Sequence, residues 1–492
     1  MSARRDDIPV RTRLQLAVEM LNPARLYGRV THLAQEYQLS RQSLYTLATQ
    51  AEHLLLAHLT PAPSGPHPPQ PRLTVTPQRL QRSILHLTLA GLSQRAVQAI
   101  LADVLEVPLA LGTVNATLAR YEARAATCNA AWQPACDEGL AADELFANGQ
   151  PHLLIVGNDS LFIYALSRQP TRDADTWGTL FLDAPAAPQV GTDGGSGLAA
   201  GLRAAGRATH QLDWDHLLRA LWRIDNQLER QAYGALALVE ERAHYVDAAQ
   251  TAKRLAQHWA RWEQAGGQAA GAVARYDQFH GLARAVDAEF AMIELPTGCL
   301  RDAAASQARL VSLAAQIKVL PGRPAQVLGT SLGTWAAGLL SYLPRLAAAL
   351  VPLGATWGVA GLQALQRLWQ VEATQRRGHQ TPTERQAGER LWQAALDEAA
   401  ARLGAALFPV YDELTEILGR SWRGSMAAEC VNSLLRPLLR GRKQSDQGIA
   451  ELFRFIHNTH TFARGKRAGQ SPAALVGIAL PAEPLDLLDW AA

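Results

Sequence analysis

The chain has 492 residues, and 48% of them are apolar, so it is long enough to form several domains with buried cores. Its formal net charge of +3 excludes a uniformly basic or acidic protein. The four cysteines have no metal-ligand spacing and are too few for a disulfide framework, which favours a reducing compartment. Residues 1–7 contain no apolar run, so we expect no secretory signal and a cytoplasmic location.

Residues 1–59 predict a helical unit with DNA-binding character. Two helices, Arg29–Gln38 and Arg41–Gln50, flank a tight turn at Leu39 and Ser40, as in a helix-turn-helix. Its internal contacts would come from four apolar side chains: Leu33, Ala34, Leu39 and Leu44. Base-edge contacts would come from the start of the second helix: Arg41, Gln42, Ser43 and Tyr45. The alternative is a plain helical hairpin with a solubilising surface.

A proline-rich segment at residues 60–76 predicts an extended, semi-rigid linker between domains. Residues 77–138 then predict a second helix-turn-helix-like unit of three helices: Pro77–Ala90, Ser93–Leu105 and Leu111–Ala126. Ser93 is a favourable N-cap, and Gly91 suits the left-handed position after the first helix. The third helix should turn three polar side chains outward: Thr113, Asn115 and Arg120. Two such units in series suit an extended, asymmetric DNA site.

Residues 139–209 change to a pattern of short strands. Four strands are predicted: Leu140–Phe146, His152–Val156, Leu161–Leu166 and Pro188–Asp193. Asn148 and Gly149 are a hairpin turn signal, and Asp173–Leu182 predicts a helix. A further helix is expected from Leu198 onward. Three antiparallel strands, a helix, then a strand and a helix is the order of an RNase H-like mixed sheet, so we predict an α/β protein that is mostly helical overall.

Residues 210–420 predict a large all-α insertion in which strand signals do not return. Two uncharged runs, Pro324–Pro344 and Leu346–Gln366, are long enough to span a membrane. Both runs are rich in Gly, Ser, Gln and Pro and dilute in Leu, Ile and Phe. We therefore predict buried helices and no membrane contact.

Residues 421–480 predict a helix with a polar face. Glu429, Asn432 and Arg436 lie at i, i+3 and i+7, which places them on one face, and Pro437 should end or kink the helix. The apolar contacts would come from Met426, Val431, Leu434 and Leu435. The alternative is a solvated polar row without a function. A helix at Gly448–Phe462 and a loose acidic tail at residues 481–492 should follow.

The same region contains a local excess of positive charge. Eight Lys/Arg residues and two acids lie between Arg436 and Arg467, which is typical of a surface that follows a phosphate backbone. The predicted backbone contacts are Arg436, Arg440, Arg442, Lys443, Lys466 and Arg467. The alternative is a surface that only keeps the protein soluble.

Two acids in the strand region are candidate metal ligands. Asp143 lies inside the first predicted strand and Asp193 ends the fourth, and an acid inside a central strand costs free energy unless a cation neutralises it. Two Mg²⁺ ions that share carboxylates could do so, with Glu429 as the third carboxylate. Asp159 suits a hairpin turn better, and Glu144 should point to the opposite face from Asp143.

With these residues the chain resembles the bacterial insertion-sequence DDE transposases. The resemblance rests on Asp143 in Ala-Asp-Glu-Leu-Phe, Asp193 in Thr-Asp-Gly-Gly-Ser-Gly-Leu, and Glu429 in Ala-Glu-Cys-Val-Asn-Ser-Leu-Leu-Arg. The ending is also similar, with Phe455-Ile-His-Asn458 and Gly465-Lys-Arg-Ala-Gly. The long interval between Asp193 and Glu429 resembles members with a helical insertion. Similar enzymes carry an acid-aromatic-His stretch near the active site, which makes His216 an accessory candidate beside Asn432.

The resemblance implies an enzyme that cuts transposon ends and joins them to target DNA. Two Mg²⁺ ions, for which Mn²⁺ can substitute, would be held by Asp143, Asp193 and Glu429. The implied partner is double-stranded DNA, and the implied assembly is a DNA-bound homodimer in the bacterial nucleoid. Two alternatives stay open: a catalytically silent DNA-binding regulator derived from a transposase, and a nuclease or resolvase on the same fold.

Overall fold

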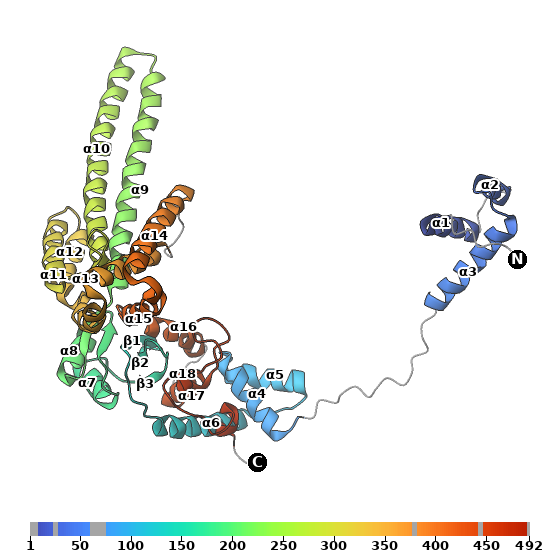
Figure 1. Ribbon diagram of the computed structural model, residues 1–492, viewed down its shortest axis with the longest axis horizontal. Helices are drawn as coiled ribbons and strands as arrows, with labels where there is room; N and C mark the ends of the chain where they lie inside the picture. Colours follow the sequence, from blue (N-terminus) through green and yellow to red (C-terminus); the bar gives the residue numbers. More distant parts are fainter. Residues whose placement is uncertain (1–7, 23–27, 60–74, 376–380, 441–445, 490–492) are drawn as a thin grey trace. The chain divides into compact units, whose positions relative to one another are not determined.

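The computed structural model describes residues 8–22, 28–59, 75–375, 381–440 and 446–489, which form two compact units, Met1–Val75 and Thr76–Ala492. Figure 1 traces both. The predicted linker at residues 60–76 falls almost entirely outside the described residues, and so do the predicted DNA contacts Arg442 and Lys443.

The described residues of the first unit form three helices, α1 (Val10–Leu21), α2 (Arg29–Glu36) and α3 (Arg41–Leu59). Its core includes Leu33 and Leu44, with Ala34 and Leu39 packed against them, so the four predicted internal contacts are confirmed. Helix α3 runs nine residues beyond the predicted end at Gln50.

The second unit begins with α4 (Pro77–Leu89), α5 (Gln94–Leu105) and α6 (Leu111–Ala131). The Ser93 side chain caps α5 by accepting a hydrogen bond from the Ala96 backbone N–H, and Gly91 has a φ of 85°, as predicted. Thr113, Asn115 and Arg120 are exposed on α6. This helix continues five residues past its predicted end, where Cys128 packs against the core beneath the sheet and the buried Asn129 donates to the Glu451 carbonyl.

A five-stranded mixed sheet follows in the order β3-β2-β1-β4-β5. Its strands are β1 (Leu140–Ala147), β2 (Gln150–Gly157), β3 (Ile163–Arg168), β4 (Gln189–Thr192) and β5 (Thr209–Leu212). β1, β2 and β3 pair antiparallel, whereas β4 is parallel to both β1 and β5. Asn148 and Gly149 turn the first hairpin with φ angles of 52° and 74°. The protein is therefore a mostly helical α/β protein.

The prediction that residues 210–420 contain no strand was wrong. β5 starts the predicted insertion as a strand, and a two-stranded ribbon of β6 (Ile293–Glu294) and β7 (Cys299–Leu300) lies within it. β5 has only four residues, and its pairing with β4 is a tertiary contact that leaves no periodic signal in the sequence.

Helices cover both faces of the sheet. Ala141, Leu145 and Leu154 share a core with α6, α16 (Met426–Arg440) and α17 (Gln447–Thr459). The alternate positions, such as Ala142 and Leu153, share a core with α7 (Ala174–Asp183) and α8 (Ser196–Ala205). Side chains alternate between the faces of a strand, so Asp143 belongs to the α16 side and Glu144 to the opposite side, as predicted.

Between β5 and α16, the residues that the structure describes form seven helices with a core of their own: α9 (Trp214–Asp247), α10 (Ala252–Glu289), α11 (Ala303–Lys318), α12 (Arg323–Leu339), α13 (Leu343–Gln375), α14 (Pro382–Leu403) and α15 (Leu407–Gly419). A short 3₁₀ turn, Gly404–Ala406, links the last two. Within the described ranges, one stretch, Arg323–Gln375, is long and apolar enough to cross a membrane. Leu332, Leu346 and Leu365 are buried in this core, but only 44% of the most apolar part of the stretch is buried, so the predicted burial is partial.

Two predictions about helix α16 were wrong. It continues through Pro437 to Arg440, and Met426 and Leu434 are exposed. The proline deprives only the Ser433 carbonyl of its helical partner, and Ser433 lies at the surface, where water can replace that bond. The buried face instead carries Ala428, Val431 and Leu435.

The prediction of a loose acidic tail was wrong for the residues up to 489. After α18 (Pro472–Leu475), a last helix, α19 (Pro484–Leu488), packs its Leu488 side chain into the core beneath the sheet. Arg82 of α4 pairs with Asp486 and Asp489, and the Tyr121 hydroxyl lies 3.2 Å from Asp489. The acids therefore fasten the end of the chain to α4 and α6.

This docking predicts that Leu488→Ala lowers the free energy of unfolding by about 2–4 kcal/mol, because the side chain is fully buried. Urea unfolding followed by tryptophan fluorescence measures the change. Leu434→Ala is the matched control, since Leu434 is 55% exposed, and it should change the free energy by less than about 0.5 kcal/mol. Equal effects of the two substitutions would mean that α19 does not hold the fold.

Candidate functional site

Two of the three predicted ligands lie level on neighbouring strands. The parallel pairs Leu140–Val190 and Ala141–Gly191 fix the register of β1 and β4, and the same offset places Asp143 beside Asp193. Asp193 follows directly after the last residue of β4. The register therefore places these two carboxyl groups close enough for the negative charge of Asp193 to act on Asp143.

Asp143 is held from two sides. The Asn432 side chain of α16 donates a hydrogen bond to Oδ2 at 2.8 Å, and the Glu144 backbone N–H donates to Oδ1 at 2.8 Å. Burial raises the pKa of Asp143 to about 6, and the negative charge of Asp193 adds to the rise, while these two hydrogen bonds oppose it. Asn432 Oδ1 is buried without a hydrogen-bond partner, so this amide orients Asp143 with one end only.

Asp193 is held by the glycine-rich turn that leads into α8. The Gly195 backbone N–H donates to its Oδ1 at 2.9 Å, and Gly194 has a φ of 84°, which favours glycine. A Cβ at Gly197 would lie 2.2 Å from the Arg172 carbonyl oxygen, so the turn can pass close to this loop only with glycine there. The Gly-Gly-Ser-Gly sequence thus allows the backbone of this turn to pass close to the backbone at Arg172.

The third predicted ligand, Glu429, points to different partners. Arg219 of α9 donates to both carboxylate oxygens, at 3.1 and 3.0 Å, and His216 Nδ1 lies 3.9 Å from Oε1. Arg219 also pairs with Asp215, one turn earlier on α9. The hydrogen bonds to Glu429 and Asp215 raise the pKa of the Arg219 guanidinium. In the described residues the carboxylates of Asp143, Asp193 and Glu429 do not converge on one point.

Asp213 joins the helices that carry these groups. One carboxylate oxygen caps α9 by accepting from the backbone N–H groups of Asp215 and His216. The other accepts from the Ser425 backbone N–H at 3.0 Å and from its hydroxyl at 2.6 Å. Ser425 directly precedes α16, so one buried side chain fixes the starts of both helices.

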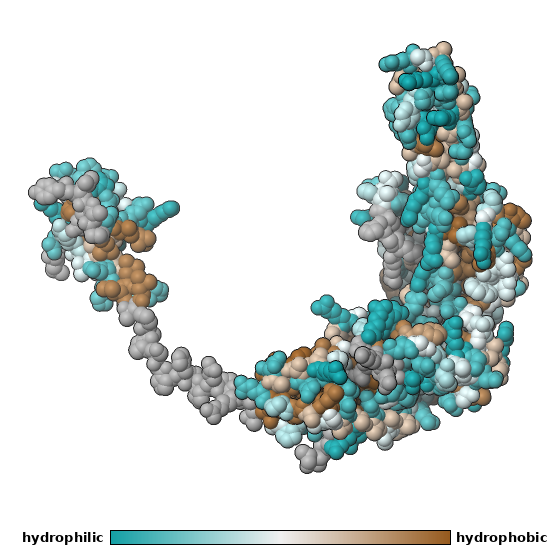
Figure 2. All heavy atoms as spheres, turned by 180° about the vertical axis from the view of Figure 1, so that it is seen from behind, coloured by the Kyte–Doolittle hydropathy of each residue, from teal (hydrophilic) through white to brown (hydrophobic). Residues whose placement is uncertain are grey.

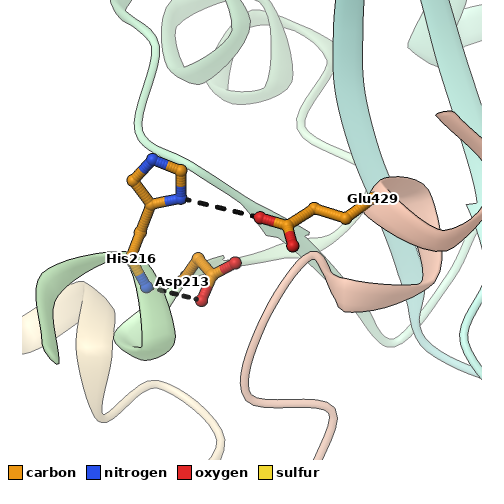
Figure 3. Close-up of side chains that lie close together, drawn as sticks. All are labelled: Asp213, His216 and Glu429. Atoms are coloured by element: carbon orange, nitrogen blue, oxygen red, sulfur yellow. Dashed lines mark hydrogen bonds and ion pairs between the residues drawn. The ribbon is translucent and has the colours of Figure 1, made fainter. Parts of the chain in front are cut away.

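Asp213, His216 and Glu429 come close enough to share an ion (Figure 3). Both oxygens of Asp213 already accept hydrogen bonds from backbone or hydroxyl donors, and a guanidinium already lies against Glu429. A cation beside Glu429 would have to compete with Arg219. The trio is therefore better explained as a hydrogen-bonded joint than as a metal centre.

A groove of about 800 Å³ opens beside this joint. Its lining includes Asp215, Glu429, Cys430 and two of the predicted DNA contacts, Lys466 and Arg467. Arg467 donates to the carbonyl oxygens of Asn158 and Asp159, which makes it part of the groove wall, whereas Lys466 is exposed.

The remaining described DNA-contact candidates lie at the surface. Arg436 and Arg440 are exposed further along α16. In the other unit, Arg41, Gln42 and Tyr45 are exposed at the start of α3, and Ser43 is half-buried against Ser40. Asp159 lies in the turn after β2, as predicted, and accepts a hydrogen bond from the Trp422 indole N–H at 2.8 Å.

Sequence reasoning missed Asp213, Arg219 and Ser425. Asp213 carried a usable signal, because an acid directly before a periodic helical segment is a common N-cap. Asp215 and Arg219 stand at i and i+4, which predicts a pair on one helix face. Nothing in the sequence indicated that Glu429 would be the second partner of Arg219, because 210 positions separate them.

Comparisons with known proteins assign no family to the chain. No protein-family model matches it, and no curated protein matches it significantly. The geometry of the site is therefore the basis for any functional conclusion.

The raised pKa of Asp143 predicts a pH-dependent cost to stability. The group's folded pKa of about 6 exceeds its ordinary value of 3.8, so the folded state binds more protons between these pH values. The free energy of unfolding should fall from pH 4 to pH 6 by about 2–3 kcal/mol through this group. Asp143→Asn should remove this loss, and Asn432 can accommodate it by turning its amide.

The measurement is urea unfolding in EDTA at pH 5 and pH 7. We expect Asp143→Asn to be more stable than the wild type at pH 7, with a smaller difference between the two at pH 5. Asp183→Asn, at an exposed carboxylate on α7, is the control and should behave as the wild type at both. A variant that is less stable than the wild type at pH 7 would contradict the assignment.

Proposed function

We propose that the chain is a metal-dependent DNA transposase. The observation that carries the proposal is the level placement of Asp143 and Asp193 on adjoining strands, with the helix of Glu429 packed over the same face and bonded to Asp143 through Asn432. An arrangement of this kind supplies hard oxygen ligands for divalent cations that act in phosphoryl transfer.

The sheet supports an RNase H-like catalytic domain. It has three antiparallel strands, followed by two strands parallel to the first, in the order β3-β2-β1-β4-β5, with helices on both faces. The order of elements that suggested this fold class in the sequence is present, with β5 as an additional parallel strand. The helical insertion enters directly after β5, at the edge of the sheet.

Asp143, Asp193 and Glu429 would hold two Mg²⁺ ions, for which Mn²⁺ can substitute. The fit is best at Asp143 and Asp193, because two neighbouring carboxylates repel one another and a cation offsets that repulsion. The bound ions would activate the attacking hydroxyl or water and stabilise the leaving oxygen. Asn432 would orient Asp143, while Glu144 is withdrawn by its pairing with Arg172.

Double-stranded DNA is the proposed substrate and partner. The helix pair α2–α3 would act as a helix-turn-helix, and Arg41 and Gln42, where base contacts would be made, are exposed. Residues 77–131 would form a second unit that recognises the DNA sequence. Lys466 and the exposed Arg436 and Arg440 would follow the backbone. We propose a cytoplasmic, nucleoid-associated enzyme that acts as a homodimer on two DNA ends.

One observation favours a second candidate, a catalytically silent DNA-binding regulator. Glu429 is bound to Arg219 rather than directed to Asp143 and Asp193. If this pairing persists with metal and DNA present, the third carboxylate does not take part in catalysis. The two candidates differ in whether the protein breaks a phosphodiester bond.

Strand cleavage of DNA that carries the element's own ends tests the enzyme proposal. The wild type should nick the ends with Mg²⁺ or Mn²⁺ and not in EDTA. Asp193→Asn should lower the rate at least about a hundredfold, because it removes a metal-binding charge. Asp183→Asn, at an exposed carboxylate at the end of α7, is the control. Cleavage by Asp193→Asn at the wild-type rate would overturn the assignment.

The dependence of DNA affinity on salt concentration distinguishes residues that contact the phosphate backbone from residues that recognise the base sequence. Arg436→Ala with Arg440→Ala should weaken binding to cognate and random DNA alike and lower the salt slope by about 0.9 for each phosphate that no longer has a basic partner. Arg41→Ala with Gln42→Ala should mainly reduce the preference for cognate ends. An unchanged salt slope in the first variant would identify α16 as a solubilising surface.

A further inference from the structure

A pocket of about 580 Å³ lies at the edge of the sheet. Four elements bound it: the edge strand β3, the first half of α17, and the C-terminal ends of α6 and α7. It shares no lining residue with the groove beside Glu429. Its volume lies in the range of small-molecule sites and far exceeds that of one water molecule, so it has room for an organic ligand.

Large apolar side chains form much of the pocket wall. Trp132, Tyr164, Leu166 and Leu180 line it, and Trp132 is held by stacking on Phe455, with ring centres 5.3 Å apart. The exterior of the larger unit mixes hydrophilic and hydrophobic residues (Figure 2). The pocket differs because it gathers apolar side chains around one positive charge.

That charge is the guanidinium of Arg454 on α17, which is partly buried. Its Nε donates to the Ile163 carbonyl oxygen of β3 at 3.0 Å. Among the described residues, its two terminal nitrogens have neither a hydrogen-bond partner nor an ion-pair partner. Burial lowers the pKa of the Arg454 guanidinium, and the charge of Glu451 opposes that effect only in part. An anion in the pocket would offset the cost of this unpaired charge.

The neighbouring acid, Glu451, is bonded to other groups. Its Oε1 accepts from the Gln447 side chain at 2.9 Å, and its Oε2 accepts from the Asn129 side chain at 2.7 Å. Both amides come from elements that bound the pocket, α17 and α6. Glu451 is therefore held away from Arg454, and the guanidinium keeps its terminal N–H groups for a ligand.

We propose that this pocket binds a small carboxylic acid with an aromatic or branched apolar body. The two terminal nitrogens of Arg454 match the two oxygens of a carboxylate in a planar, bidentate pair. The apolar body would lie against Trp132 and Leu180. This inference does not depend on the proposed activity, because the pocket and the catalytic candidates have no residue in common.

A peptide that pairs with the edge strand fits this place poorly. Asn458 already bonds the backbone N–H and carbonyl of Ile163, and Gln447 bonds the Leu166 carbonyl and the Arg168 N–H. These are the outward backbone groups that an added strand would use. A free small molecule needs none of them.

A phosphate group also fits less well than a carboxylate. The pocket's other charged lining residues are acids, Glu451 and, at the rim, Asp183. They would repel a dianion, whereas Arg454 balances a single negative charge. One arginine between two acids is likewise unsuited to a DNA backbone, which needs an excess of positive charge.

Binding of three acids to the full chain tests the proposal: phenylacetate, 3-phenylpropionate and indole-3-acetate. The measurement is a saturation-transfer NMR titration without DNA and in EDTA. At least one acid should bind with a Kd of about 1 mM or tighter, which is the level that about ten non-hydrogen atoms provide. Its primary amide should bind at least about tenfold more weakly, because the amide cannot form the charged pair. This comparison needs only the wild type.

Substitution of the arginine locates the site. Arg454→Met should weaken binding of the same acid at least about tenfold, and Arg454→Lys, which keeps the charge without the fork, should lie between it and the wild type. Arg168→Met removes an exposed arginine from the same edge strand and should leave binding unchanged. Far-UV circular dichroism shows whether each variant is folded.

Three results would each overturn the proposal: no binding of any of the three acids, an amide that binds as tightly as its acid, or unchanged binding in folded Arg454→Met. Tighter binding of phenyl phosphate than of phenylacetate would overturn the carboxylate assignment and give the pocket to phosphate esters. None of these outcomes involves strand cleavage, so they leave the proposed activity to its own test.

Discussion

The carboxylate of Asp213 is the constraint on which the centre of the larger unit depends. It is 4% exposed, and an isolated charge so deeply buried would cost several kcal/mol. Four hydrogen bonds offset that cost, two from the start of α9 and two from Ser425 before α16. The side chain thereby connects the helical insertion to the helix that covers the sheet.

The same joint determines where the neighbouring charges lie. Arg219 stands less than two turns after Asp213 on α9, and Glu429 stands one turn after Ser425 on α16, so the joint sets both partners of their ion pair. Aromatic rings reinforce it. The Arg423 guanidinium lies 4.5 Å from the Trp214 ring, and the Arg345 guanidinium lies 4.4 Å from the Trp422 ring. Both contacts join the helical insertion to the segment that leads into α16.

The edge of the sheet is closed by side chains rather than by another strand. Asn458 of α17 both donates to and accepts from the backbone of Ile163, and Gln447 accepts from the Arg168 backbone N–H while donating to the Leu166 carbonyl. These amides satisfy backbone groups that an edge strand leaves open. They also hold α17 against β3.

The sequence by itself determined most of the helices, the first hairpin turn, the strands β1 to β4, and the candidacy of Asp143 and Asp193. Periodicity, caps and turn residues are local, so these features could be predicted. It did not determine β5, the passage of α16 through Pro437, the docking of α19, or the partners of Glu429. The passage of α16 through Pro437 depends on the exposure of the Ser433 carbonyl, and the others depend on contacts between residues distant in the chain, such as Arg82 with Asp489 or Arg219 with Glu429. The tertiary structure decided them because such pairings form only when the whole unit packs, and no local pattern records which distant side chain will be near.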